Sequence, residues 1–494
     1  MQNASPPRAL LIDLNNFARY PTLAIGYLVA GLRSSGLEVD VLSPLSHDVA
    51  PTEREPPETR RAHLERRVYF STHPLMLPVH DAMRAGWSKW NQRPDPRVIE
   101  QATAALDAQR PDVVLLSAYL DHHPSVCAIG TLCRSRRVPL ILGGPVLNLP
   151  EIAREWLSVP GLTALVGGEV DFSLPRILET LFAAGDLAEL PGVFLPDGRT
   201  GPPAQPLAGL ERLPVADFTD FPWEKYPQRV IPIMTGRGCG WGRCLFCGDV
   251  VTANGRGFRS RPVDRVLDEL EEQSQRHATK NVVFLDIKLN SSLDMWHGLI
   301  DGFQDRLPGG RWIGTVHVQA RGENGLTADE LRAARAAGME RISFGLETGS
   351  ERVNTSMAKG TKLERTSEFI RDAHAAGLSV RTTTMLGYPG EKAEDVVATK
   401  QFIGRHEHAL DRISMSRFKV IPGTAFHRQY ERHPDRYRDL THFKWHFGDG
   451  RAHYRYKPAA ARDYRRAKAD LLRLVHRINR KPLRGGADVF TGVM

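Results

Sequence analysis

The stretch Gly238-Cys239-Gly240-Trp241-Gly242-Arg243-Cys244-Leu245-Phe246-Cys247-Gly248 holds three of the five cysteines of this 494-residue chain. It follows an apolar run at 230–234 that is typical of a short strand. Iron–sulfur clusters are held by thiolates at such tight spacing, whereas a closed structural zinc site takes four protein ligands. The loop therefore predicts an iron–sulfur cluster with one open iron on Cys239, Cys244 and Cys247. A zinc knuckle is the alternative.

The composition is that of a globular protein with more than one domain. The chain has 41% hydrophobic and 25% charged residues and a net charge of +9. No basic block with interleaved aromatics points to nucleic acid. The sequence has neither an apolar secretion segment at its start nor a run of about 18 apolar residues, so we expect no membrane association and a reducing, cytoplasmic location. Cys127 and Cys133 are interpreted as buried apolar residues.

Downstream of the cysteine loop, strand and helix patterns alternate. The strand before the loop and five later ones predict a parallel, partial (βα)6 barrel of the TIM type at 229–425, two strands short of a closed barrel. Residues 426–494 are expected to form a C-terminal cap or tail. The five later strands are expected at 281–286, 312–320, 341–347, 380–387 and 412–420, and the helices at 262–275, 292–303, 327–337, 363–376, 394–406 and 461–478.

The upstream part, residues 1–185, shows the same alternation and predicts a doubly wound, Rossmann-like α/β domain. Residues 46–95 interrupt the pattern, as an inserted loop or a helical excursion over a site, and 186–228 are expected to be a linker. Ligands of such sheets bind beyond the carboxyl ends of the strands. The first turn lacks Gly-x-Gly-x-x-Gly, so a nicotinamide cofactor is not expected. The residues at the strand ends are Asn15, Ser117, Gly143, Gly144 and Gly168.

The cysteine loop followed by a partial barrel resembles the radical S-adenosylmethionine (SAM) superfamily. Phe246 stands at the family's aromatic position before the last cysteine, although four residues separate the first two cysteines where three are common. The resemblance implies a [4Fe–4S] cluster on Cys239, Cys244 and Cys247, with SAM on the open iron. One electron, from an external donor such as flavodoxin or ferredoxin, would cleave SAM to a 5′-deoxyadenosyl radical.

The same resemblance gives cofactor-binding roles to residues at the strand ends of the barrel. It implies that Asp286 meets the methionyl portion of SAM and that Arg321 pairs with its carboxylate. Glu347 would take the ribose or the amino group. Gly387 would lie beside the adenine, and Pro422 would close the sixth strand.

The upstream domain resembles the cobalamin-binding domain that precedes the barrel in one large subfamily. The Asp-x-His-x-x-Gly marker of other cobalamin proteins is absent, so cobalt is expected to receive no histidine from the first-turn loop. Tyr119 would lie near one face of the cobalt. The resemblance is carried by residues 21–28, the strand end at Ser117, Gly143-Gly144-Pro145 and Gly168-Glu169.

Together the two resemblances imply a cobalamin-dependent radical SAM methyltransferase of specialised metabolism. The radical would activate a small-molecule or peptide substrate, and methylcobalamin would methylate it at an unactivated carbon or at phosphorus. Two alternatives stay open. One is a cobalamin-dependent radical enzyme that catalyses a rearrangement, cyclisation or oxidation without methyl transfer, and the other is a non-catalytic sensor. The identity of the substrate is not predicted.

Overall fold

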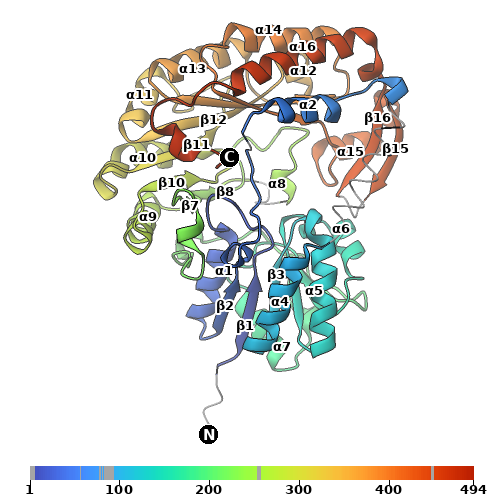
Figure 1. The fold of residues 1–494 in the computed structure, drawn as a ribbon, viewed down its shortest axis with the longest axis vertical. Coiled ribbons are helices and arrows are strands. Elements are labelled where there is room, and N and C mark those ends of the chain that lie inside the picture. The colour runs from blue at the N-terminus through green and yellow to red at the C-terminus, as the bar shows by residue number, and fades with distance from the viewer. Residues whose placement is uncertain are drawn as a thin grey trace.

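Two parallel sheets lie one above the other, each with its own helices (Figure 1). The computed structural model describes residues 6–493 except 56, 77–78, 80–81, 83–93, 253–256 and 447–449. Among the described residues, no helix is both long and apolar enough to span a bilayer.

The first sheet has the order β2-β1-β3-β4-β5-β6, and only β6 runs antiparallel to its neighbour. This flavodoxin-like order confirms the doubly wound fold and puts its switch point between β1 and β3. Buried apolar side chains form a core on each face of the sheet. The strands are β1 (Arg8–Ile12), β2 (Glu38–Leu42), β3 (Val113–Ser117), β4 (Leu140–Gly143), β5 (Leu162–Val166) and β6 (Val193–Phe194).

Capping residues fix where some of the α-helices of the first domain begin. Asp95 caps α4 (Pro96–Gln109) by accepting a hydrogen bond from the Arg97 amide, and Pro96 fills the first helical position. The others are α1 (Leu23–Ser34), α5 (His123–Arg136), α6 (Pro150–Trp156) and α7 (Leu174–Phe182), with the short helices η3 (Leu120–His122), η4 (Pro145–Asn148) and η5 (Leu187–Glu189).

The second sheet has the order β14-β13-β12-β11-β10-β7, with every neighbouring pair parallel. The six strands confirm the partial barrel. They are β7 (Ile231–Ile233), β10 (Asn281–Phe284), β11 (Arg311–Val316), β12 (Met339–Glu347), β13 (Ser379–Leu386) and β14 (Arg412–Arg417). A two-stranded ribbon, β8 (Gly236–Arg237) with β9 (Arg259–Ser260), flanks the cysteine loop.

Amphipathic helices cover the barrel and bury a core rich in aromatic side chains. Thr327 caps α11 in a reciprocal capping box with Glu330. The helices are α8 (Asp249–Thr252), α9 (Val263–His277), α10 (Leu293–Arg306), α11 (Ala328–Ala336), α12 (Glu351–Ser356), α13 (Leu363–Ala375) and α14 (Ala393–Arg405), with η8 (Leu289–Ser291).

The segment 186–228, predicted as a linker, packs closely on the first domain. It adds β6 to the first sheet, and it contains the short helices η6 (Leu210–Arg212) and η7 (Trp223–Lys225). Phe218 is 1% exposed, and a methyl group on Gly26 of α1 would come within 2.3 Å of its ring. Glycine at this position therefore lets the segment lie directly against α1.

The interruption after β2 is a helical excursion onto the barrel. It carries η1 (Pro44–His47), α2 (Arg60–Tyr69) and η2 (Pro74–Met76), while most of its last part lies outside the described residues. Helix α2 packs against the C-terminal helix α16 (Arg462–Asn479), far from β1 and β2 (Figure 1). Glu55 forms ion pairs with Arg341, which is fully buried, and with Arg381, both on barrel strands.

The C-terminal part contains a hairpin that sequence periodicity did not reveal. Strands β15 (Leu440–His446) and β16 (Arg451–Tyr456) pair antiparallel and lie above α6 in Figure 1. A methyl group on Gly450, beside the hairpin, would come within 2.3 Å of Leu120 of the first domain. The hairpin thus closes one side of the space between the domains. The remaining elements are α15 (Ala425–Arg432), η9 (Pro434–Tyr437), η11 (Lys457–Ala460) and η12 (Gly485–Phe490).

Candidate active site

The start of the cysteine loop is fixed by Asp286, which follows β10. Its carboxylate accepts hydrogen bonds from the amides of Thr235 and Gly236 at 3.1 Å and from the Thr235 hydroxyl at 2.7 Å. Burial raises the pKa of Asp286 to about 6, although these hydrogen bonds oppose the rise. Asp286 therefore holds the loop onto the sheet. Its contact with SAM stays a prediction.

The three cysteines lie half-buried on one loop. The Gly240 amide donates to Ser291 Oγ at 3.2 Å, and the Leu245 amide donates to the Met357 carbonyl at 3.0 Å. Burial raises the pKa of Cys244 to about 11, with the nearby Cys239 sulfur adding to the rise and Lys359 opposing it. A thiol in this environment gives up its proton when a metal replaces it.

The long gap between the first two cysteines is occupied by a packed tryptophan. Trp241 Nε1 donates to the Ala358 carbonyl at 3.0 Å, and the ring stacks on His317 at 5.9 Å between centroids. Gly242 turns the chain back with a φ of +56°. A methyl group on Gly360 would come within 2.1 Å of the Trp241 ring, so glycine is needed there. The four-residue gap between the first two cysteines therefore accommodates the packed Trp241 side chain and the turn at Gly242.

A buried ion pair lies beside the cysteines. Glu347 ends β12 with a φ of +62°, and Lys359 Nζ donates to its Oε1 at 3.0 Å, as does the Thr383 hydroxyl. Burial alone would lower the pKa of Lys359, but Glu347 and the sulfurs of Cys244 and Cys247 outweigh it and the pKa is raised. Lys359 is a cation placed next to the thiolates. No pattern in the sequence marked it.

Three other predicted contacts lie at the same edge of the barrel. The Gly387 amide donates to Glu391 Oε2 at 2.7 Å, and burial raises the pKa of Glu391 to about 7. Arg321 is exposed in the loop after β11. Pro422 comes before Gly423 and the capping residue Thr424 of α15. For none of these residues does the geometry test the predicted contact with SAM.

The carboxyl edge of the first sheet is built from small residues. Gly144 has a φ of +151°, and a methyl group there would come within 2.0 Å of the Ala118 carbonyl oxygen. Ser117 and Gly143 are register partners at the ends of β3 and β4, and Pro145 begins η4. Glycine at 144 is therefore required by the close approach of this turn to the end of β3.

The first turn of this domain contains buried polar groups. Asn15 is 4% exposed, and its Oδ1 has no hydrogen-bond partner among the described residues. Burial raises the pKa of Asp13 to about 6, while the Thr22 hydroxyl donates to its carboxylate at 3.0 Å. An unpartnered buried oxygen at a sheet switch point fits a site that a polar ligand completes.

Other predicted residues of this edge are engaged within the protein. The Glu169 carboxylate accepts hydrogen bonds from Arg259 at 2.6 and 2.8 Å, and Asp171 pairs with Arg237 at 2.7 Å through both oxygens. A cofactor contact through Glu169 would compete with this link to the β8–β9 ribbon. The Gly168 amide donates to the Asn148 side chain at 2.6 Å.

Tyr119 is 42% exposed just beyond β3. Its amide donates to His122 Nδ1 at 3.1 Å, and the two rings meet edge to face. His123 packs on Trp156. The Tyr119 side chain is thus partly accessible at the end of β3.

The two edges face each other. Helix α8, directly after Cys247, packs against η4, which follows Gly143 and Gly144. A methyl group on Gly423 would come within 2.9 Å of Leu149 in the first domain. The structure therefore brings the cysteine loop next to the glycine-rich edge.

Comparison with known proteins defines the class. The Radical SAM superfamily model matches residues 233–403, so this part of the chain is a radical SAM domain, which implies a [4Fe–4S] cluster and SAM. The chain is 28% identical over 242 residues to bacteriochlorophyllide d C-12(1)-methyltransferase of Chlorobaculum tepidum, covering 48% of each protein.

Two solved structures share the whole arrangement. The radical SAM methyltransferase TsrM from Kitasatospora setae, bound to tryptophan and a SAM analogue, matches with a TM-score of 0.67 at 17% identity, over 95% of this chain and 89% of TsrM. The cobalamin-dependent SAM radical enzyme OxsB, with aqua-cobalamin and SAM bound, matches with a TM-score of 0.71 at 16% identity, over 94% of this chain and 66% of OxsB. The chain has the fold of the two-domain cobalamin-dependent radical SAM enzymes. It spans about half the length of the bacteriochlorophyllide relative and two thirds of OxsB.

Proposed function

We propose that the chain is a cobalamin-dependent radical SAM methyltransferase. The observation that carries this proposal is the contact between α8, at the end of the cysteine loop, and η4, at the glycine edge. Cys239, Cys244 and Cys247 would hold the [4Fe–4S] cluster. When bound, the cluster and SAM supply a 5′-deoxyadenosyl radical, and methylcobalamin supplies the methyl group.

The chain's own groups suit these roles. Lys359 would offset the negative charge of the thiolates, and the Glu347 carboxylate that accepts its hydrogen bond would also take the ribose or the amino group of SAM. The turn at Gly143 and Gly144 would lie beside the corrin ring, with Asn15 Oδ1 as an acceptor. The β15–β16 hairpin would shield the radical from water.

The substrate would lie between the two edges and is a small molecule or a peptide. An external one-electron donor of the flavodoxin or ferredoxin type would reduce the cluster. A reducing, cytoplasmic location suits three cysteines that must stay available to iron.

Product analysis tests the proposal without knowledge of the substrate. The chain is reconstituted anaerobically with iron, sulfide and cobalamin, reduced, and given SAM. We expect 5′-deoxyadenosine, which needs the cluster, and S-adenosylhomocysteine, which needs added cobalamin. The Cys244→Ala variant should lose the first product, and Cys127→Ala, in the first domain, should keep both.

The outcomes separate the alternatives. Formation of deoxyadenosine without any cobalamin-dependent S-adenosylhomocysteine would contradict the methyltransferase proposal and would indicate a radical enzyme that does not transfer methyl groups. If neither product forms in a sample whose spectra show a full complement of cluster and cobalamin, the result would indicate a non-catalytic sensor.

A further inference from the structure

A hollow of about 330 Å³ lies between the end of α2 and the first half of α16, outside the site described above. Among the described residues that line it, six are basic and none is acidic. The basic residues are Arg67, His73, Arg462, Arg465, Arg466 and Lys468.

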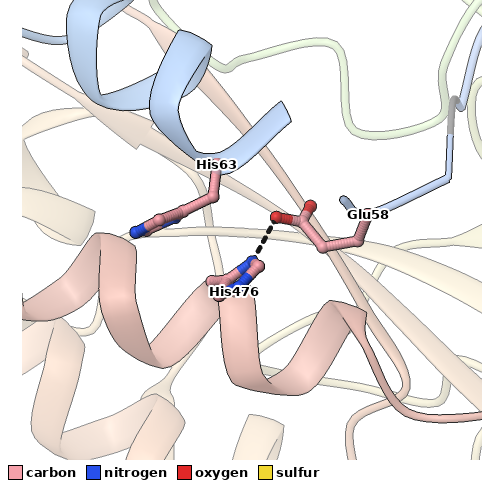
Figure 2. Close-up of side chains that lie close together, drawn as sticks. All are labelled: Glu58, His63 and His476. Carbon is pink, nitrogen blue, oxygen red and sulfur yellow. Dashed lines mark hydrogen bonds and ion pairs between the residues drawn. The ribbon is translucent and has the colours of Figure 1, made fainter. Parts of the chain in front are cut away.

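Three polar side chains, Glu58, His63 and His476, hold helix α2 against α16, as Figure 2 shows. His476 Nδ1 lies 2.7 Å from Glu58 Oε1, and the His63 ring stacks on His476 at 4.3 Å. Arg66 donates to both oxygens of Glu58. The ligand atoms of Glu58, His63 and His476 lie within 4.8 Å of one another, but Arg66 already balances the carboxylate, so we assign this cluster a structural role.

The walls of the hollow are held in place by hydrogen bonds. Lys468 Nζ donates to the Thr72 hydroxyl at 2.7 Å, and Arg417 lies over the Tyr69 ring at 4.8 Å. Arg462, Arg465 and Arg466 recur at the spacing of one helix face. The three guanidinium groups thus share the face of α16 that lines the hollow.

The charge inside the hollow is only partly balanced by the described protein groups, since Glu391 acts on Lys468 but no acidic residue among them lines the hollow. Nε and Nη1 of Arg465 are buried and have no hydrogen-bond partner among the described residues. A buried charged donor without an acceptor is costly. Burial, with further contributions from Arg417 and Arg465, also lowers the pKa of Lys468 to about 7. An anion with several oxygens would satisfy the donors and offset the crowded positive charge.

We propose that this hollow binds a phosphate group, either as free phosphate or as a monoester of a small molecule. Phosphate offers three terminal oxygens and nearly two negative charges, which match planar guanidinium forks better than a carboxylate does. The proposal does not depend on the methyltransferase assignment, because none of the residues lining the hollow belongs to the cysteine loop or to the glycine edge.

Calorimetric titration of the reconstituted full chain tests the site. Inorganic phosphate and glucose 6-phosphate are titrated separately at constant ionic strength set with potassium chloride. We expect saturable binding at one site per chain. Tighter binding of the ester would identify a monoester as the ligand, and equal or tighter binding of inorganic phosphate would identify the free ion.

Variants locate the binding. Arg465→Met should weaken phosphate binding about 10-fold or more, and Arg466→Met, at an exposed position where little change in stability is expected, should weaken it by a smaller factor. Arg473→Met is the control, because Arg473 is exposed on the same helix and pairs with Asp470. No saturable binding by the wild-type chain, or unchanged binding in both pocket variants, would overturn the proposal.

Discussion

The carboxyl edges of the two sheets share a topology and differ in chemistry. Both sheets are parallel, so both bring their strand ends and loops to one edge, where ligands of such folds bind. The barrel edge is lined by thiols and buried charges, such as Cys244 and the Glu347–Lys359 pair. The edge of the first sheet is lined by glycines and by the buried amide of Asn15.

This difference reflects what each edge would hold. A small, highly charged cluster and SAM need fixed charges of opposite sign close by. A large, flat corrin ring needs room, which side chains would take away. The ion pairs Asp171–Arg237 and Glu169–Arg259 then hold the two edges at one separation.

The largest effect is expected from the cluster loop. Cys244→Ala should abolish the cluster absorbance and lower deoxyadenosine formation by at least about 100-fold, because a metal ligand is removed. Iron content and product formation are the measurements. Cys127→Ala is the matched control. A Cys244→Ala protein with a full iron complement would show that the barrel edge holds no cluster on this loop.

Removal of one charge from the barrel edge should cost stability. Lys359→Met leaves Glu347 buried and unpaired, and we expect a loss of about 3–5 kcal/mol in the free energy of unfolding. Denaturant unfolding of the barrel transition measures it. The double variant Lys359→Met/Glu347→Gln should recover much of the loss. Lys400→Met is the control, because its pair with Asp470 at 3.8 Å is largely exposed and is worth at most about 1 kcal/mol.

The glycine edge should be sensitive to shape instead of charge. Gly144→Ala adds a methyl group that would clash with the Ala118 carbonyl at a φ of +151°. We expect a cost of about 1–3 kcal/mol and a loss of cobalamin binding, measured by absorbance after gel filtration. Gly198→Ala is the control. Gly198 has a φ of +90°, but a methyl group there would meet no other atom within 4 Å, so the substitution should strain the backbone and leave cobalamin bound. Unchanged binding in Gly144→Ala would contradict a corrin site at this edge.

The last effect is a dependence of stability on pH, and it concerns the buried carboxyl group at the barrel edge. Burial raises the pKa of Glu391 from 4.5 to about 7, so the folded chain holds this proton more tightly than the unfolded chain. The contribution of Glu391 to stability is complete below about pH 4.5 and is lost as the pH rises to about 7, by up to about 1.4 kcal/mol per pH unit. Glu391→Gln should flatten the dependence of Tm on pH between 5 and 7. The exposed Glu364→Gln should leave it unchanged.

The sequence by itself determined the elements and the chemistry that is local. Alternating strand and helix patterns predicted both parallel sheets, because periodicity and caps such as Thr327 depend on near neighbours. Three cysteines within nine residues predicted a metal loop, because the ligands share one short segment.

Only the tertiary structure decided which distant groups meet. Glu169 pairs with Arg259, and Asp286 accepts a hydrogen bond from Thr235. The sequence did not indicate these partners, because a strand end offers its side chain to whatever packs nearby, and the cofactor contacts of both residues stay predictions. Lys359 became part of the site through the turn that brings it to Glu347. The course of α2 onto the barrel and the β15–β16 hairpin were likewise invisible, since their partners lie hundreds of residues away or in a segment with weak periodicity.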